Sequence, residues 1–104
     1  MHIDHVCVAV RSLSASEKRL CEVLGYRPRT EVVTNTRQKV NVRFLQREGS
    51  LDIKLIEPYG DDSPLWGFLR SKGEGLHHLC FRTADLNAQL AELAGRGLRI
   101  LSAP

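Results

Sequence analysis

Histidine and cysteine recur in the same order in two apolar segments of the chain. His5 and Cys7 lie near the start, and His78 and Cys80 lie 73 positions later. Residues two apart in a strand point to the same face, so each histidine shares a face with its cysteine. Imidazole nitrogen is a common ligand of zinc and similar ions. The pattern predicts a divalent-metal site at His5 and His78; the alternative is two histidines that only make structural hydrogen bonds.

The cysteines allow two interpretations. Cys7 and Cys80 would complete a Cys2His2 zinc site, but residues i and i+2 of a strand are roughly 6.5–7 Å apart, wider than adjacent ligands of one tetrahedral ion prefer. We therefore favour small core cysteines. His77 has the opposite strand parity to His78, so we predict that it points toward the helices and is not a ligand. Three widely spaced cysteines without a CxxC motif do not indicate a disulfide framework.

Hydrophobic periodicity predicts the elements that position these residues. The first cycle has a strand over 3–10, a helix that begins at Ser12 or Ser14 and ends at Gly25, and strands over 30–34, 40–45 and 51–56. The second has a short helix over 65–72, a strand over 76–82, a helix over 86–94 and a strand over 98–101. The prediction is an α+β fold of paired βαβββ modules in one domain, 1–104. Residues 1–60 form the first module, and 61–104 form a linker helix and a partial second module.

Composition limits the classes of function. The 104 residues are 42% hydrophobic and 26% charged, which is typical of one globular domain. A net charge of +3 is too small to indicate a nucleic-acid partner, and no apolar run is long enough to span a membrane. The start lacks the features of a signal peptide, so we expect a cytoplasmic protein. The partial second module would expose a strand edge, which leads us to expect a homodimer or further residues beyond Pro104.

Five segments together resemble a known family. They are His-Val-x-Val-Ala-Val from His5, Leu-Gly-Tyr from Leu24, Ile-Lys-Leu-Ile-Glu-Pro from Ile53, Asp-Ser-Pro-Leu-Trp-Gly-Phe-Leu from Asp62, and Gly-Glu-Gly-Leu-His-His-Leu-Cys-Phe-Arg from Gly73. The chain resembles the vicinal oxygen chelate superfamily of glyoxalase I, bleomycin-resistance proteins and extradiol dioxygenases, and within it the methylmalonyl-CoA epimerases. The resemblance runs over 3–101 and implies paired βαβββ modules around a metal cleft.

The resemblance implies that His5 and His78 bind one divalent ion, such as Co, Mn, Ni or Zn. The family's third ligand, usually Glu or Gln, falls on Lys54, whose ammonium has no lone pair. The fourth ligand is a glutamate that also serves as a catalytic carboxylate in the epimerases, and its position falls after Pro104. The other carboxylate has no clear match and falls near Val42. We predict that Lys54 is a catalytic group that stabilises an enolate oxygen or binds an anion; the alternative is a solvated lysine on an edge strand.

The implied activity is that of an epimerase-like or glyoxalase-like isomerase or lyase, acting on a small acyl thioester or carbonyl substrate. The alternative is a non-catalytic module that sequesters a small molecule, as in bleomycin resistance. Arg37 and Lys39 lie in an unusually polar stretch over 35–39. We predict that they bind the phosphates of a CoA-linked ligand, with a solvated basic face as the alternative.

Overall fold

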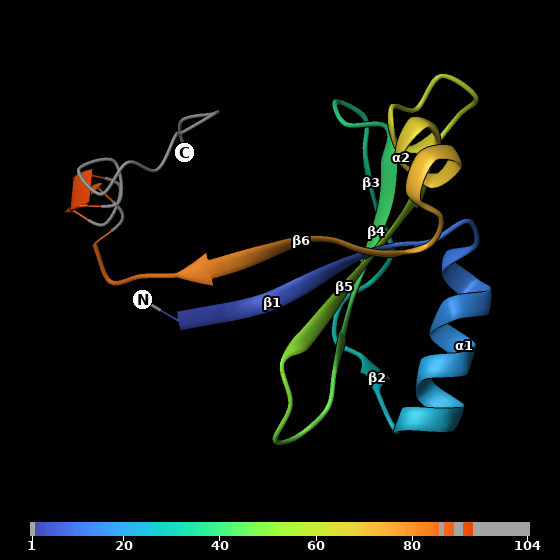
Figure 1. Ribbon diagram of the computed structural model, residues 1–104. Helices are drawn as coiled ribbons and strands as arrows, with labels where there is room; N and C mark the ends of the chain where they lie inside the picture. Colours follow the sequence, from blue (N-terminus) through green and yellow to red (C-terminus); the bar gives the residue numbers. More distant parts are fainter. Residues whose placement is uncertain (1, 86, 89–90, 93–104) are drawn as a thin grey trace.

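The fold is a twisted mixed sheet with one helix on each face, and it confirms the predicted α+β class (Figure 1). The computed structural model describes residues 2–85, 87–88 and 91–92. The elements in chain order are β1 (His2–Ala9), α1 (Leu13–Leu24), β2 (Arg27–Pro28), β3 (Val33–Asn35), β4 (Val40–Gln46), β5 (Asp52–Pro58), α2 (Leu65–Lys72) and β6 (Gly75–Arg82). In the described part, no helix is long and apolar enough to cross a membrane. The predicted elements over 86–94 and 98–101 lie mostly or wholly outside the described residues.

The strand order of the sheet is β2-β4-β5-β1-β6, with β3 also paired to β4. β1 and β5 are parallel, and the other pairs are antiparallel. The parallel pair requires a crossover, which runs through α1 and the strands that follow it. This connection confirms the βαβββ order predicted for the first module.

The strand predicted over 30–34 is confirmed only in part, because the strand there is the shorter β3, Val33–Asn35, and a separate strand, β2, precedes it at Arg27–Pro28; both pair with β4. Between them, the backbone N–H of Arg29 donates to the carbonyl of Phe44 at 2.8 Å. The N–H of Phe44 then donates to the hydroxyl of Thr30 at 3.1 Å instead of to a backbone carbonyl. This side-chain acceptor interrupts the ladder and ends β2.

The pairing of β1 with β6 agrees with the internal repeat. His5 lies opposite Cys80, and Cys7 lies opposite His78. A two-fold axis that runs between the two antiparallel strands exchanges His5 with His78 and Cys7 with Cys80. Each histidine then lies opposite the cysteine of the other strand. Directly opposite residues share a face, so the prediction that these four side chains lie on one face of the sheet is confirmed.

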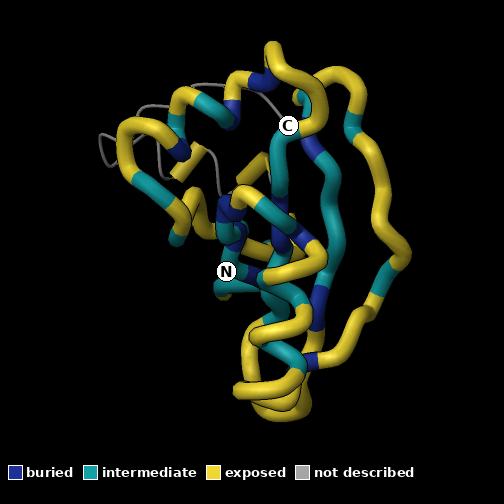
Figure 2. The backbone as a smooth tube through the Cα atoms, turned by 90° about the vertical axis from the view of Figure 1, so that its right-hand side faces the viewer, coloured by how far each residue is buried: buried dark blue, intermediate teal, exposed yellow. Residues whose placement is uncertain are grey.

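The two faces of the sheet carry separate cores, and the buried residues lie mainly in the central strands and on the helix sides that face them (Figure 2). On the α1 face the buried residues are Val10, Leu13, Tyr26, Leu45 and Leu55. On the α2 face they are Cys7, Ala9, Val40, Ile56, Leu65 and Leu69. Alternating strand residues supply the two cores, as a sheet covered on both sides requires.

Candidate functional site

A cleft of about 430 Å³ opens on the α2 face, between the sheet and the first turn of α2. Its lining residues come from the β3–β4 turn, β4, β5, α2 and β6: Arg37, Gln38, Val40, Lys54, Ile56, Pro64, Leu65, Phe68, His77 and His78. The polar groups are two permanent cations, two imidazoles and an amide, set against an apolar wall, and no carboxylate is among these described lining residues. The cleft therefore suits a ligand that has both an anionic and an apolar part.

Lys54 lies at the centre of this arrangement. On β5 it is opposite Cys7 of β1 and Phe44 of β4, and its Nζ lies 5.9 Å from the centroid of the Phe44 ring. It also lines a second cavity of about 300 Å³ on the β4 side. Among residues 2–85, no carboxylate forms an ion pair with it. The half-buried ammonium is thus left to interact with a ligand.

His5, on β1, is buried, with 8% of its surface exposed. Its Nδ1 lies 2.8 Å from Oδ2 of Asp4, and its ring packs edge-on against Phe44 at 5.0 Å. The hydrogen bond with His5, aided by the charge of Arg82, holds the pKa of the Asp4 carboxyl below its usual range. One nitrogen of His5 is therefore already engaged.

His77 does not follow the predicted parity. The register between β1 and β6 shifts between Cys7, opposite His78, and Val8, opposite Leu76, so His77 is an extra residue in β6. Such a β-bulge lets consecutive side chains point to the same face. The Nδ1 atoms of His77 and His78 are 2.8 Å apart, and the His77 ring packs against Phe68 of α2 at 4.6 Å. His77 therefore contacts a helix, as predicted, but the expectation from strand parity that it lies on the other face from His78 is wrong because of the bulge.

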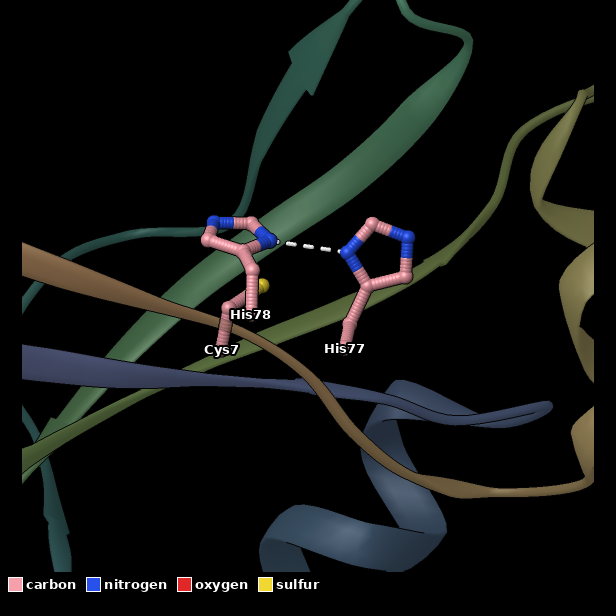
Figure 3. A group of neighbouring side chains, drawn as sticks. All are labelled: Cys7, His77 and His78. Atoms are coloured by element: carbon pink, nitrogen blue, oxygen red, sulfur yellow. Dashed lines mark hydrogen bonds between the residues drawn. The ribbon is translucent and has the colours of Figure 1, made fainter. Parts of the chain in front are cut away.

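Cys7 completes a cluster with these two histidines (Figure 3). The donor atoms of Cys7, His77 and His78 all lie within 4.8 Å of one another. Cys7 is fully buried, as predicted for a core cysteine, and burial raises the pKa of its thiol to about 11, against the opposing effect of the Lys54 charge. Desolvation lowers the pKa of His78, aided by the neighbouring His77, Lys54 and His5, which favours the neutral imidazole.

Arg37 and Lys39 lie in different surroundings. The side chain of Asn35 accepts hydrogen bonds from the backbone N–H groups of Arg37 at 3.1 Å and Gln38 at 3.0 Å, which fixes the turn beside the cleft. Arg37 lines the cleft. Lys39 does not line it, and its ammonium pairs with the carboxylate of Asp62.

The family relationship is clear from the sequence. Residues 4–104 match the family model of the glyoxalase/bleomycin resistance protein/dioxygenase superfamily. The chain belongs to this superfamily. The resemblance to the vicinal oxygen chelate proteins is confirmed.

Similar proteins include several epimerases. The chain is 38% identical over 99 residues to the uncharacterized protein YqjC of Bacillus subtilis, covering 95% of this chain and 69% of that protein. It is 35% identical over 101 residues to mouse mitochondrial methylmalonyl-CoA epimerase, covering 96% of this chain and 56% of the enzyme. The chain thus spans little more than half the length of that enzyme.

A solved structure agrees with the sequence comparison. A variant of Streptomyces coelicolor methylmalonyl-CoA epimerase, in complex with 2-nitronate-propionyl-CoA, matches with a TM-score of 0.84 and 29% sequence identity. The match covers 98% of this chain and 76% of the epimerase chain. The protein is therefore a glyoxalase-fold protein similar to the epimerases.

The superfamily often uses a divalent metal, and the residues at the corresponding positions here fit one poorly. By the family resemblance Lys54 falls at the position of the third ligand, where it would bring a positive charge instead of a lone pair. The hydrogen bond of His5 Nδ1 with Asp4 leaves Nε2 free as a ligand atom, but His5 belongs to no group of three donors in the described residues. The Cys7, His77 and His78 cluster is the part of the described site where three donor atoms do converge.

Proposed function

We propose that the protein is an epimerase-like isomerase that binds a coenzyme A thioester or a similar carbonyl compound in the cleft. The observation that carries the proposal is the Lys54 ammonium, which lies in the cleft without a carboxylate partner in the described structure. The similarity to epimerases, one of which was solved with 2-nitronate-propionyl-CoA, supports an acyl-CoA as the class of ligand.

The proposed reaction removes the proton on the carbon next to the thioester carbonyl. The C–H bond breaks, its electron pair moves into an enolate, and the negative charge develops on the carbonyl oxygen. The Lys54 ammonium would stabilise that oxygen, and it acts in a partly desolvated cleft where charge interactions are stronger than in water. A proton from water adds to the other face of the carbon, and the base that took the first proton releases it to solvent, which completes the isomerisation.

The proton acceptor in this proposal is the histidine pair. Of the described side chains that line the cleft, His77 and His78 carry the imidazole nitrogens that can accept a proton when the rings are neutral. Because the two rings share one hydrogen bond, the proton taken from carbon would be distributed between them. Arg37, at the rim, would bind a phosphate of the CoA moiety.

Solvent-deuterium exchange tests the proposal. The protein is incubated with methylmalonyl-CoA in D2O, and incorporation at the α-carbon is followed by mass spectrometry. We expect Lys54→Met to slow exchange by about 100-fold or more. Lys18→Met, which removes an exposed lysine on α1 at the opposite face, should leave it unchanged. Equal exchange rates for the wild type and Lys54→Met would refute the role of Lys54.

A non-catalytic binding module is the second candidate, favoured by the lack of a carboxylate among the described residues that line the cleft. For this function the ligand would bind to the Lys54 ammonium and the apolar wall without reacting. Calorimetric binding of the acyl-CoA to the wild type, with no deuterium incorporation above the rate without protein, would support this candidate over the isomerase.

A divalent ion at His5 and His78 stays a separate prediction, and the reaction above does not depend on it. The substitution Lys54→Glu replaces a cation by a carboxylate ligand, so we expect it to raise the affinity for Co, Mn, Ni or Zn. Elemental mass spectrometry after loading and desalting measures the retained ion. No gain in metal affinity would argue against a position for Lys54 beside these histidines.

We also propose a homodimer. Leu79 and Phe81, on the edge strand β6, are 43% and 51% exposed. Burying such apolar side chains against a second copy would stabilise association. Analytical ultracentrifugation that shows a stable monomer at micromolar concentration would contradict this proposal.

A further inference from the structure

We propose that Cys7, His77 and His78 form a binding site for a thiophilic metal ion, and that Cu(I) is its preferred occupant. This site differs in two of its ligands from the His5 and His78 pair predicted from the sequence. The inference does not rest on the isomerase function, and it would stand if the protein only bound its ligand.

The pairing of β1 with β6 brings the three donors together. Cys7 lies directly opposite His78, and the bulge turns the adjacent His77 to the same face. The donor atoms lie within 4.8 Å of one another, whereas the ligand atoms of one ion are typically about 3–4 Å apart. Side-chain rotation over about 1 Å therefore suffices, without a change in the backbone.

The histidine pair can reach the protonation state that metal binding needs by moving one proton. A hydrogen bond between two Nδ1 atoms requires that one is a donor and the other an acceptor, so one ring presents a lone pair at Nδ1. The other can present one there if its proton moves to Nε2. Phe68, packed against the His77 ring at 4.6 Å, limits the orientations that this ring can take.

The surrounding charge selects among ions. Lys54 lies beside Cys7 in the sheet, and no anion neutralises it in the described structure. With one thiolate, Zn(II) would leave a net charge of +1 next to this ammonium, whereas Cu(I) would give a neutral site. A soft thiolate ligand also favours Cu(I). The same reasoning disfavours Mn(II) and Mg(II), which prefer oxygen ligands.

The cysteine of the cluster is buried and the two histidines are exposed, an arrangement that suits a metal site. Cys7 is fully buried, so its sulfur is shielded from solvent, while His77 and His78 are exposed and line the cleft. An ion would therefore enter through the cleft and meet the two histidines first. Cys7 does not line the cleft, so its thiolate would be reached through the histidines. Metal binding would also occupy the lone pairs that the proposed reaction uses, so a Cu(I)-loaded protein should not exchange the α-proton.

Anaerobic titration with Cu(I) in competition with bicinchoninic acid tests the site. We expect the wild type to withdraw one Cu(I) per chain from the chelator. Cys7→Ser and, separately, His77→Ala should weaken binding by about 100-fold or more. His77 is exposed, so its replacement keeps the test valid if the buried Cys7→Ser variant does not fold. The Cu(I)-loaded protein should show an ultraviolet thiolate-to-copper charge-transfer band that Cys7→Ser abolishes.

Two control variants distinguish this site from binding elsewhere on the protein. Cys21→Ser removes a half-buried thiol on α1 and should leave Cu(I) binding unchanged. His5→Ala should also retain Cu(I), because His5 is not part of the cluster. The proposal is overturned if the folded His77→Ala variant binds Cu(I) as tightly as the wild type, or if the Cu(I)-loaded wild type has no thiolate-to-copper charge-transfer band. It is also overturned if His5→Ala loses Cu(I).

Discussion

The two faces of the sheet differ in whether a central charged side chain has a partner within the protein. On the α1 face, Arg43 pairs with Glu17 at 3.0 Å, and Glu57 accepts hydrogen bonds from the N–H of Leu13 at 2.7 Å and from Asn41 at 3.0 Å. On the α2 face, Lys54 has no ion-pair partner in the part of the chain that the structure describes. The α1 face thus satisfies these polar groups internally. On the α2 face Arg29 pairs with Asp52 at 2.9 Å, but Lys54, in the cleft, is left for a ligand.

The unpaired charge of Lys54 supports the proposal that the α2 face binds the ligand, on energetic grounds. A half-buried charge without a partner costs folding free energy, whereas the pairs on the α1 face recover part of that cost. Functional sites are where folded proteins retain such unfavourable groups. The β-bulge at His77, close to Lys54 in the cleft, is a second local irregularity on the same face.

The largest expected effect is the loss of stability when a core leucine on either face is replaced by alanine; only one of the two substitutions should also weaken ligand binding. Leu55 and Leu69 are at most 1% exposed and lie in the cores of the α1 and α2 faces respectively. Each Leu→Ala substitution should lower the free energy of unfolding by about 2–5 kcal/mol, measured by urea denaturation. Only Leu69→Ala should also weaken acyl-CoA binding to the folded fraction, because α2 forms a wall of the cleft.

The opposite result would remove the distinction between the faces. If Leu55→Ala weakens acyl-CoA binding to the folded protein as much as Leu69→Ala does, the cleft does not depend on α2 in particular. Calorimetry at a temperature where both variants remain folded provides this comparison.

The second effect concerns charge. Arg43 and Glu17 are about one-fifth exposed, at 22% and 20%, so Arg43→Met would leave a largely buried carboxylate without its partner. We expect a loss of about 1–3 kcal/mol in the free energy of unfolding. Lys54→Met removes an unpaired ammonium and should be neutral or stabilising. Urea denaturation of both variants measures the difference; a larger loss for Lys54→Met would show that this lysine is paired in solution.

The third effect is on affinity alone. Arg37 lines the cleft, so Arg37→Ala should weaken binding of an acyl-CoA by about fivefold through loss of one exposed phosphate contact. Lys39, paired with Asp62 outside the lining, should have a smaller effect when replaced by Ala. Calorimetric titration with the same acyl-CoA ranks the two. Unchanged affinity in both variants would remove the turn over 35–39 from the binding site.

Strand alternation explains why much of this arrangement was predictable. The period of two placed His5, Cys7, His78 and Cys80 on one face, and the register confirms it. The resemblance to the superfamily singled out Lys54, and the cleft contains it. The inference about the shared face holds because it depends on the alternation of a regular strand, which side chains seldom change.

Local departures from regular geometry explain what was missed. The bulge moves His77 to the face of His78, and no pattern of residue types in Leu76–Leu79 identifies which residue is extra. The interruption between β2 and β3 depends on one hydroxyl, Thr30, replacing a carbonyl. Both features follow from long-range pairing, which a strand's own sequence does not contain.

The smallest effect concerns the exposed pair of Lys39 and Asp62. The hydrogen bond from Lys39 is the main reason that the pKa of the Asp62 carboxyl lies below its usual range. A carboxyl with a lowered pKa in the folded state stabilises the fold above its unfolded pKa, and this contribution is lost as the pH falls through the folded value. Lys39→Ala should raise the pKa of Asp62, measured by carbon NMR titration of the carboxyl. An unchanged value would mean that this pair is not formed in solution. Lys39 would then be a free cation beside the cleft, as Lys54 is within it. The two lysines would differ only in how far they are buried.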